Sequence, residues 1–309
     1  MKKILLPLLL LCTLFMLCGC GRKETVTVLS FSGEGCKVNG PNSRAVVISD
    51  KAVTITSEGV YELTGTGKLP LIVNAASGKA VYLTLNGLDL SCDNSAPIWI
   101  QKASMVVINL KEGTQNTITD RHLYTEIADS SEGKDALTEI PSAAICSKAP
   151  LLLQGNGKLI LSAESYNGIS TNDTLTIKGG NLTINAKHHG LKGKDYVSIS
   201  GGNIAIKAQD GDGIKATNTD NQSLGYINIT GGNITVNAND EGIFAPSSLS
   251  VSGGNLVIKS KKTALQTTGT LTLNGGIIDI TTTAVPLNGA QKNLTTGVLI
   301  TVNGRPYKP

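Results

Sequence analysis

The sequence predicts an all-β protein of the solenoid class, a parallel β-helix with about 22 residues in each coil. A Gly-Gly-Asn triplet recurs along the chain, and each copy opens a short strand in which apolar and polar residues alternate. The last glycine of each copy stands at positions 157, 180, 202, 232, 254 and 276, in steps of 23, 22, 30, 22 and 22. No window after the leader shows a sustained 3.6-residue period with caps. A β-propeller would need repeats of about 40 residues, and a β-sandwich would not keep so strict a period.

The first element is a leader. Two lysines precede an apolar run at 4–17, and Leu-Cys-Gly-Cys at 17–20 is typical of a lipobox. The apolar run is short for a membrane span, which needs about 20 residues. We therefore expect residues 1–19 to be a lipoprotein signal peptide and Cys20 to carry the lipid, which anchors the protein to the cell membrane or surface outside the cytoplasm. An ordinary signal peptide or a single transmembrane anchor is the alternative.

Charge and cysteine content argue against several classes of protein and of metal site. Without the two leader lysines, 25 Lys and Arg residues face 23 Asp and Glu residues, a balance that argues against a nucleic-acid partner. Three cysteines besides Cys20 give no complete disulfide framework. The three histidines have no CxxC partner, so a Cys/His metal site is not expected. We expect a monomer.

The remaining chain divides into a short end and one long solenoid. Residues 20–44 are expected to form a lipidated linker and an N-terminal cap, and residues 45–309 the β-helix. A charged, turn-rich stretch at 119–141 is expected to interrupt the solenoid as an inserted loop, either functional or inert. A smaller insertion at 218–225 accounts for the 30-residue step.

Stacked coils, about 4.8 Å apart, place equivalent side chains in columns. The glycine of each repeat supplies the positive φ of a corner, and the asparagine after it can hydrogen-bond with its copies in neighbouring coils. One inward apolar column is expected from the residue that follows each turn: Ile145, Ile169, Leu191, Ile214, Ile243 and Leu265.

The same alignment stacks acidic residues and predicts calcium. Asp212 is expected over Glu241, and Asp173 over Asp195. Like charges opposed in a ladder are unfavourable, so some of these acids are protonated or a cation lies between them. Oxygen-rich clusters suit Ca²⁺, although Asp and Asn are also common in solvated turns. The candidate ligands are Asp173, Asp195, Asp210, Asp212, Asn218, Asp240 and Glu241.

Several ordered motifs carry a resemblance to a known family. The runs NGISTNDTLTIKGGNLTINA (167–186), HGLKGKDYVSISGGNIAIKA (189–208) and EGIFAPSSLSVSGGNLVIKS (241–260) resemble the bacterial surface-anchored carbohydrate-binding domain family, whose repeats read DGI…GKD…I.GG.I.I. The resemblance implies a right-handed parallel β-helix similar to pectate lyases, calcium along the turns, and binding of cellulose or acidic plant polysaccharides. His189 and Asn167 replace an acid that the family repeats usually carry, so we expect fewer or weaker calcium sites.

The candidates for sugar contact are aromatic and basic. Sugars pack their C–H faces on exposed rings, and lysines hold acidic polymers. The candidates are Trp99, Tyr166, Phe244, Lys192 and Lys215. Each ring could instead cap its neighbouring coil, and the lysines could simply keep the solenoid soluble.

Three functions are consistent with these residues. The first is a lipid-anchored module that binds polysaccharide with calcium. The second is a pectate-lyase-like enzyme, in which Lys192 and Lys215 are weak candidates for the base. The third is a structural or adhesive surface protein without glycan binding.

Overall fold

The computed structural model describes residues 26–75, 78, 80–123 and 141–307. The leader, the lipidation candidate Cys20 and most of the 119–141 insertion lie outside these residues. Strand β10 extends to Asp120, so the insertion begins two residues later than the sequence suggested. Among the described residues, no helix is long and apolar enough to cross a membrane.

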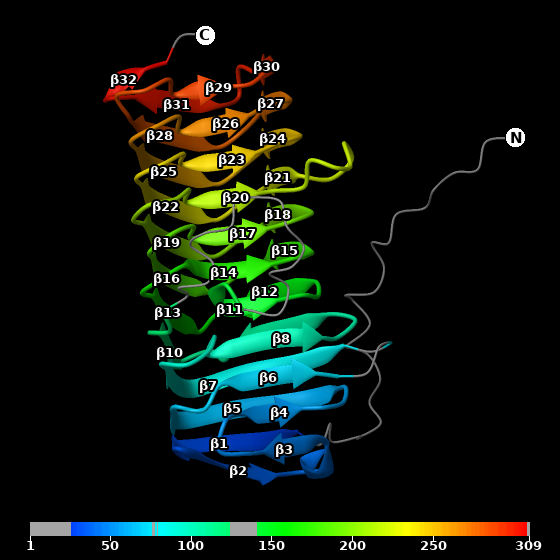
Figure 1. Ribbon diagram of the computed structural model, residues 1–309. Coiled ribbons are helices and arrows are strands. Elements are labelled where there is room, and N and C mark those ends of the chain that lie inside the picture. Colours follow the sequence, from blue (N-terminus) through cyan, green and yellow to red (C-terminus); the bar gives the residue numbers. More distant parts are fainter. Residues whose placement is uncertain (1–25, 76–77, 79, 124–140, 308–309) are drawn as a thin grey trace, which may run out of the picture.

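The described chain is an all-β solenoid of stacked coils, with a single turn of 3-10 helix at Ser43–Ala45 (Figure 1). Apart from antiparallel pairs near the ends, each strand pairs in parallel with the equivalent strand of the next coil, so a coil contributes one rung to each face.

An 11-stranded sheet forms one face. Its strands, in order of stacking, are β3 (Val46–Ile48), β4 (Val53–Ile55), β6 (Leu71–Asn74), β8 (Ile98–Lys102), β11 (Ala143–Ser147), β14 (Asn167–Thr171), β17 (Leu191–Gly193), β20 (Ile214–Ala216), β23 (Ile243–Ala245), β26 (Leu265–Thr267) and β29 (Leu287–Asn288).

A 21-stranded sheet bends at the glycine corners and supplies two further faces. The first run contains β9 (Val106–Leu110), β12 (Leu151–Gly155), β15 (Thr174–Ile177), β18 (Tyr196–Ile199), β21 (Tyr226–Ile229), β24 (Ser248–Val251), β27 (Thr270–Leu273) and β30 (Gln291–Leu294). The second run contains β10 (Gln115–Asp120), β13 (Lys158–Ala163), β16 (Asn181–Ala186), β19 (Asn203–Ala208), β22 (Asn233–Ala238), β25 (Asn255–Ser260), β28 (Ile277–Thr281) and β31 (Leu299–Val302). Near the N-terminal end, β5 (Gly59–Gly67) and the long strand β7 (Val81–Cys92) take the place of both runs, and β7 pairs with β9 and β10.

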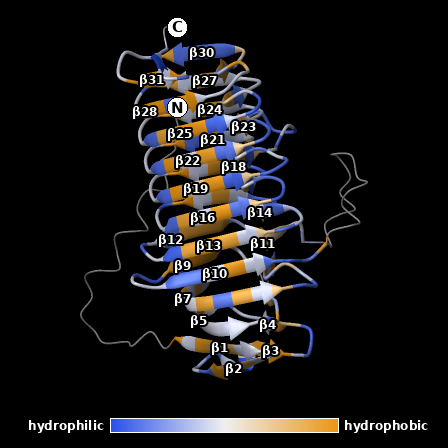
Figure 2. Ribbon diagram, turned by 90° about the vertical axis from the view of Figure 1, so that its left-hand side faces the viewer, coloured by the Kyte–Doolittle hydropathy of each residue, from blue (hydrophilic) through white to orange (hydrophobic). Residues whose placement is uncertain are grey.

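The core lies inside the coils and follows the predicted columns. The registers place Ile145, Ile169, Leu191, Ile214, Ile243 and Leu265 on successive rungs, and all six are fully buried. Along β19, Ile204, Ile206 and Ala208 point inward, and the residues between them are exposed. Figure 2 shows the same alternation of hydrophobic and hydrophilic residues along the stacked strands.

The roles predicted for glycine and asparagine at the corners of the coils are also confirmed. The second glycine of each pair has positive φ, as in Gly232 with φ of 97°. The asparagine after it forms the predicted ladder: Asn203 Nδ2 donates to Asn181 Oδ1 at 2.7 Å, and Asn233 Nδ2 donates to Asn203 Oδ1 at 2.8 Å.

Antiparallel strands close both ends of the described stack. At the N-terminal end, β1 (Thr27–Gly33) pairs in parallel with β5 and antiparallel with β2 (Gly35–Asn39). At the other end, β32 (Arg305–Pro306) pairs antiparallel with β31. The parallel hydrogen-bonding pattern of the coils therefore changes at each end.

Candidate functional site

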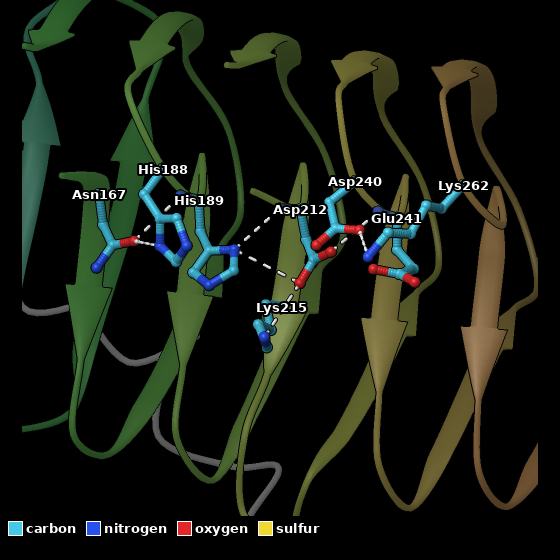
Figure 3. Close-up of polar contacts among 8 residues, drawn as sticks. All are labelled: Asn167, His188, His189, Asp212, Lys215, Asp240, Glu241 and Lys262. Carbon is cyan, nitrogen blue, oxygen red and sulfur yellow. Dashed lines mark hydrogen bonds and ion pairs between the residues drawn. The ribbon is translucent and has the colours of Figure 1, made fainter. Parts of the chain in front are cut away.

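A buried polar column runs along the turn that precedes the 11-stranded sheet (Figure 3). It consists of Asn167, His189, Asp212 and Glu241, two residues before the inward apolar residue of four successive coils. Asn167, His189 and Asp212 are at most 3% exposed. Because the coils stack in register, each of these side chains faces the backbone of the next coil.

Hydrogen bonds link the column from coil to coil. The backbone N–H of His189 donates to Asn167 Oδ1 at 3.1 Å, that of Asp212 to His189 Nδ1 at 2.9 Å, and that of Glu241 to Asp212 Oδ1 at 3.0 Å. Each side chain therefore accepts the N–H that a turn would otherwise leave unpaired.

His189 is held neutral in this column. Its Nδ1 accepts a hydrogen bond, which places the ring proton on Nε2. Burial, reinforced by His188, Lys215 and Lys192, holds its pKa well below the usual range. The adjacent His188 also has a lowered pKa, mainly through burial, and stacks on Tyr166 with ring centroids 5.0 Å apart. The ring of Tyr166 is therefore half-buried against its neighbouring coil.

Three carboxylates meet where the column ends. Asp212, Asp240 and Glu241, here called the acid cluster, each bring an oxygen within 4.8 Å of the others. Burial raises the pKa of Glu241 to about 7, and hydrogen bonding and repulsion from Asp212 and Asp240 add to the effect. The predicted like-charge stack is thus present in this coil pair, and it helps to raise the pKa of Glu241 into the neutral range.

Two lysines compensate the other two carboxylates. Lys215 Nζ lies 3.3 Å from Asp212 Oδ2, and Lys262 pairs with Asp240 Oδ1 from the next coil. Burial raises the pKa of Asp240, but the contact with Lys262 outweighs it, so the pKa lies below the usual range. Lys262 was not singled out in the sequence, and its position one coil beyond Asp240 was the signal available.

The other predicted metal ligands do not join the acid cluster. Asp210 pairs with Lys187 at 2.7 Å on the exposed side of the turn. The carboxylate of Asp173 accepts a hydrogen bond from the backbone of Thr174, and Asp195 accepts one from Asn218 Nδ2 at 2.7 Å. Only Asp173 makes the local turn contact typical of an Asx residue, whereas Asp210 and Asp195 contact side chains of neighbouring coils.

The predicted sugar-contact residues lie mostly in one outward column of the 11-stranded sheet. Trp99 stands in register with Cys146, followed on the next rungs by Ser170, Lys192, Lys215 and Phe244. We call the outward side of β8, β11, β14, β17, β20 and β23 the lysine face. Trp99 was not assigned to this column from the sequence, although it follows an inward isoleucine as Lys215 does.

The lysine face and the acid cluster are in direct contact. Lys215 Nζ reaches Asp212 on one side and lies 5.5 Å from the centre of the Phe244 ring on the other. The lysine face therefore places cationic and aromatic groups next to the acid cluster.

The acid cluster has the donor chemistry of a hard-cation site. Three carboxylates converge, and Ca²⁺ takes six to eight oxygen ligands from carboxylates, backbone carbonyls and water. The residues present fit such an ion in donor type. Within the chain, Lys215 and Lys262 balance the charges of two of these carboxylates.

Known proteins resemble this chain over most of the solenoid. Residues 49–306 match the family described as Carbohydrate-binding domain-containing protein. A protein of that description from Acetivibrio thermocellus is 35% identical over 195 residues, which are 60% of this chain and 65% of the relative. A solved structure, the polysaccharide lyase-like protein from C. thermocellum as a gadolinium derivative, superposes with a TM-score of 0.66 and 33% identity, covering 87% of this chain and 99% of that chain. The family resemblance of the repeats is thereby confirmed, and the chain belongs to the carbohydrate-binding domain-containing protein family.

Proposed function

We propose that this protein binds an acidic polysaccharide on the lysine face, with calcium held by the acid cluster. The observation that carries the proposal is the outward column itself. It sets Phe244, Lys215 and Lys192 on successive rungs, with Trp99 three rungs further along the same column, beyond the buried Ser170. Adjacent rungs are about 4.8 Å apart, so the two ammonium groups can meet carboxylates on one polymer chain.

The aromatic residues supply the second part of the contact. A ring packs against the C–H face of a sugar and buries apolar area, and a tryptophan contributes most of all. Trp99 and Phe244 are half-buried, so part of each residue is accessible to solvent. The lysines give charge selectivity, and the rings give contact area.

Calcium would enter between Asp212, Asp240 and Glu241. It would supply a positive charge that offsets these three carboxylates and favours an acidic sugar nearby. Glu241 would release its proton, and Lys262 would turn away from Asp240. The gadolinium derivative of the related protein makes a lanthanide a suitable probe of this site in the present chain.

We also propose the finer features that the repeat motifs implied. The coils are right-handed, since parallel strands joined by crossovers are right-handed in about 98% of cases. The protein is a lipoprotein anchored through Cys20 outside the cytoplasm, so the lysine face is available to extracellular polymers.

The test is a binding titration with polygalacturonate in calcium and in EDTA. Lys192→Gln should weaken binding about tenfold, which corresponds to the loss of one charge-assisted contact. Trp99→Ala should weaken it by a similar factor. Lys207→Gln removes an exposed lysine from a different face and should bind like the unchanged protein.

The outcomes of this titration distinguish glycan binding from a structural role and from lyase activity. Equal losses in all three variants, or no binding by the unchanged protein, would overturn the proposal. If EDTA lowers the melting temperature and no glycan binds, the structural role is favoured instead. Release of unsaturated uronate during the titration would identify a lyase.

A further inference from the structure

The N-terminal end of the described stack exposes the end of the apolar core. Among the described strands, β2 pairs only with β1 and β3 only with β4, so these two strands form the last rungs (Figure 1). We call residues 35–48, which run from β2 through the 3-10 turn to β3, the N-terminal layer. Its inward positions lie opposite buried residues of β1 and β4 and are Cys36, Val38, Val46 and Ile48. No described coil covers them, and Ile48 is 44% exposed.

The inward positions at the two ends of the stack differ in charge. On β30, at the opposite end, Lys292 occupies the register position of the buried Leu271. The N-terminal layer has no charge at an inward position: three of the four side chains are aliphatic, and burial raises the pKa of the Cys36 thiol to about 11, so that thiol is neutral. Val47 on the outward side adds apolar surface and is 54% exposed. This end of the solenoid can therefore lie against an apolar phase without burying a charge.

The charges of the N-terminal layer are positive. Lys37 and Arg44 are its only charged residues, and both are exposed. Of the acids that flank the layer, Glu34 pairs with Lys68 at 3.8 Å, and Asp50 is followed by a lysine in the sequence. Long basic side chains lay their stems along apolar surface and place their charges at the level of lipid headgroups. The combination of apolar and basic groups therefore fits the surface of an anionic bilayer.

The proposed lipid anchor is close to this layer along the chain. Cys20 stands six residues before Val26, and six residues span at most about 21 Å. Val26 lies beside the N-terminal layer, since a Cβ added to Gly40 would come within 2.7 Å of the Val26 carbonyl oxygen. A lipid at Cys20 therefore keeps the N-terminal layer within reach of the bilayer, at an effective concentration that favours even weak contacts.

We infer that the N-terminal layer docks on the surface of an anionic lipid bilayer, so that the solenoid stands with its long axis pointing away from the membrane. The inference rests on the proposed anchor at Cys20, and it adds a protein surface that sets the orientation of the anchored molecule. Lys215 lies seven rungs from β3 in the 11-stranded sheet, which places it about 34 Å from the N-terminal layer. Physiological salt screens charges beyond about 8 Å, so the anionic headgroups do not compete with a polymer for the lysine face.

The test uses the full acylated chain in vesicles of phosphatidylcholine and phosphatidylglycerol with brominated acyl chains. Trp99 is the single tryptophan of the chain and lies three rungs from β3. Val47→Trp adds a reporter in the N-terminal layer, and bromine should quench its emission, whereas the emission of Trp99 in the unchanged protein should not be quenched. Val257→Trp is the matched control, because Val257 is an exposed valine on the distant strand β25, and it should match the unchanged protein.

The positive charges give a second test of the same contact. Lys37→Gln/Arg44→Gln, added to Val47→Trp, should weaken docking at least about tenfold, because each basic residue near an anionic surface contributes about fivefold. Vesicles of phosphatidylcholine alone should have the same effect. Lys207→Gln/Lys259→Gln removes two exposed lysines from the second run and should leave the quenching unchanged.

The inference is overturned if Val47→Trp is not quenched, if Val257→Trp is quenched equally, or if the quenching survives loss of the two basic residues. A dimer of the unchanged protein that Ile48→Lys dissociates would identify a second copy of the chain as the occupant and would also overturn it. Binding of polygalacturonate should be the same in all of these variants, and its absence in the unchanged protein would overturn the role of the lysine face and leave docking in place. An intact mass without acyl chains on Cys20 would overturn the anchor and the inference together.

Discussion

Glu241 shows how coil stacking changes the chemistry of one side chain. The carboxylate lies over Asp212 and beside Asp240, and burial with these neighbours raises its pKa to about 7. A carboxyl whose pKa is raised in the folded state binds its proton more tightly there than in the unfolded chain. Its contribution to stability is complete below the unfolded pKa, near 4.5, and is lost as pH rises through about 7.

Glu241→Gln should remove this pH dependence. In EDTA, the unchanged protein should lose about 1 kcal/mol more stability than the variant between pH 5 and pH 8, a value reduced for solvent screening, because the opposite contribution of His189 is common to both proteins. Thermal unfolding across this pH range measures the difference. Glu164→Gln alters an exposed carboxylate paired with Arg121 and should follow the unchanged protein. Parallel curves for Glu241→Gln and the unchanged protein would contradict the assignment.

His189 should give stability the opposite dependence on pH. Its pKa is lowered in the folded state, so its contribution to stability is present above the unfolded value of about 6.5 and is lost as pH falls below it. His189→Asn should reduce acid sensitivity, because Asn167 one coil away already shows that an asparagine oxygen can accept the next backbone N–H. Denaturant unfolding at pH 5 and pH 7.5 checks this. A larger loss at pH 5 in the variant would refute it.

At the scale of the strand, the asparagine ladder ties neighbouring corners together. Asn203 donates to Asn181 and accepts from Asn233, whereas the side chain of Asn255 makes no hydrogen bond within the described chain. Asn203→Ala should therefore cost about 1 kcal/mol, and Asn255→Ala should cost close to nothing. The two melting temperatures form the comparison, and equal values would show that the ladder adds nothing to stability.

The strand registers explain which side-chain positions could be predicted from the sequence. The positions of Asn167, His189, Asp212 and Glu241 follow from the repeat count, because each coil sets its side chains directly over the last. The contact of Lys262 with Asp240 does not follow, because a long flexible side chain can reach several neighbours. The position of Trp99 in the column of Lys192 could not be predicted, because the insertion after β10 interrupts the 22-residue spacing between them.

At the scale of the whole molecule, a solenoid must prevent its ends from pairing with other chains. Antiparallel strands β2 and β32 end the parallel pattern of the described stack. A second device lies on β30, where Lys292 occupies the register position of the buried Leu271 on the previous rung. A charge at an inward position of an edge strand opposes the addition of another coil.

Lys292→Leu should remove that protection and promote association. The variant continues the apolar column to the edge of the stack, so two molecules could bury it by pairing edge to edge. Self-association should tighten at least about tenfold, or about 1.4 kcal/mol, in sedimentation velocity over a concentration series. Lys259→Leu places the same apolar side chain on the outside of β25, which is paired on both sides, and should leave the sedimentation profile unchanged. Association of both variants would point to general surface hydrophobicity, and association of neither would show that the antiparallel end strands are sufficient by themselves.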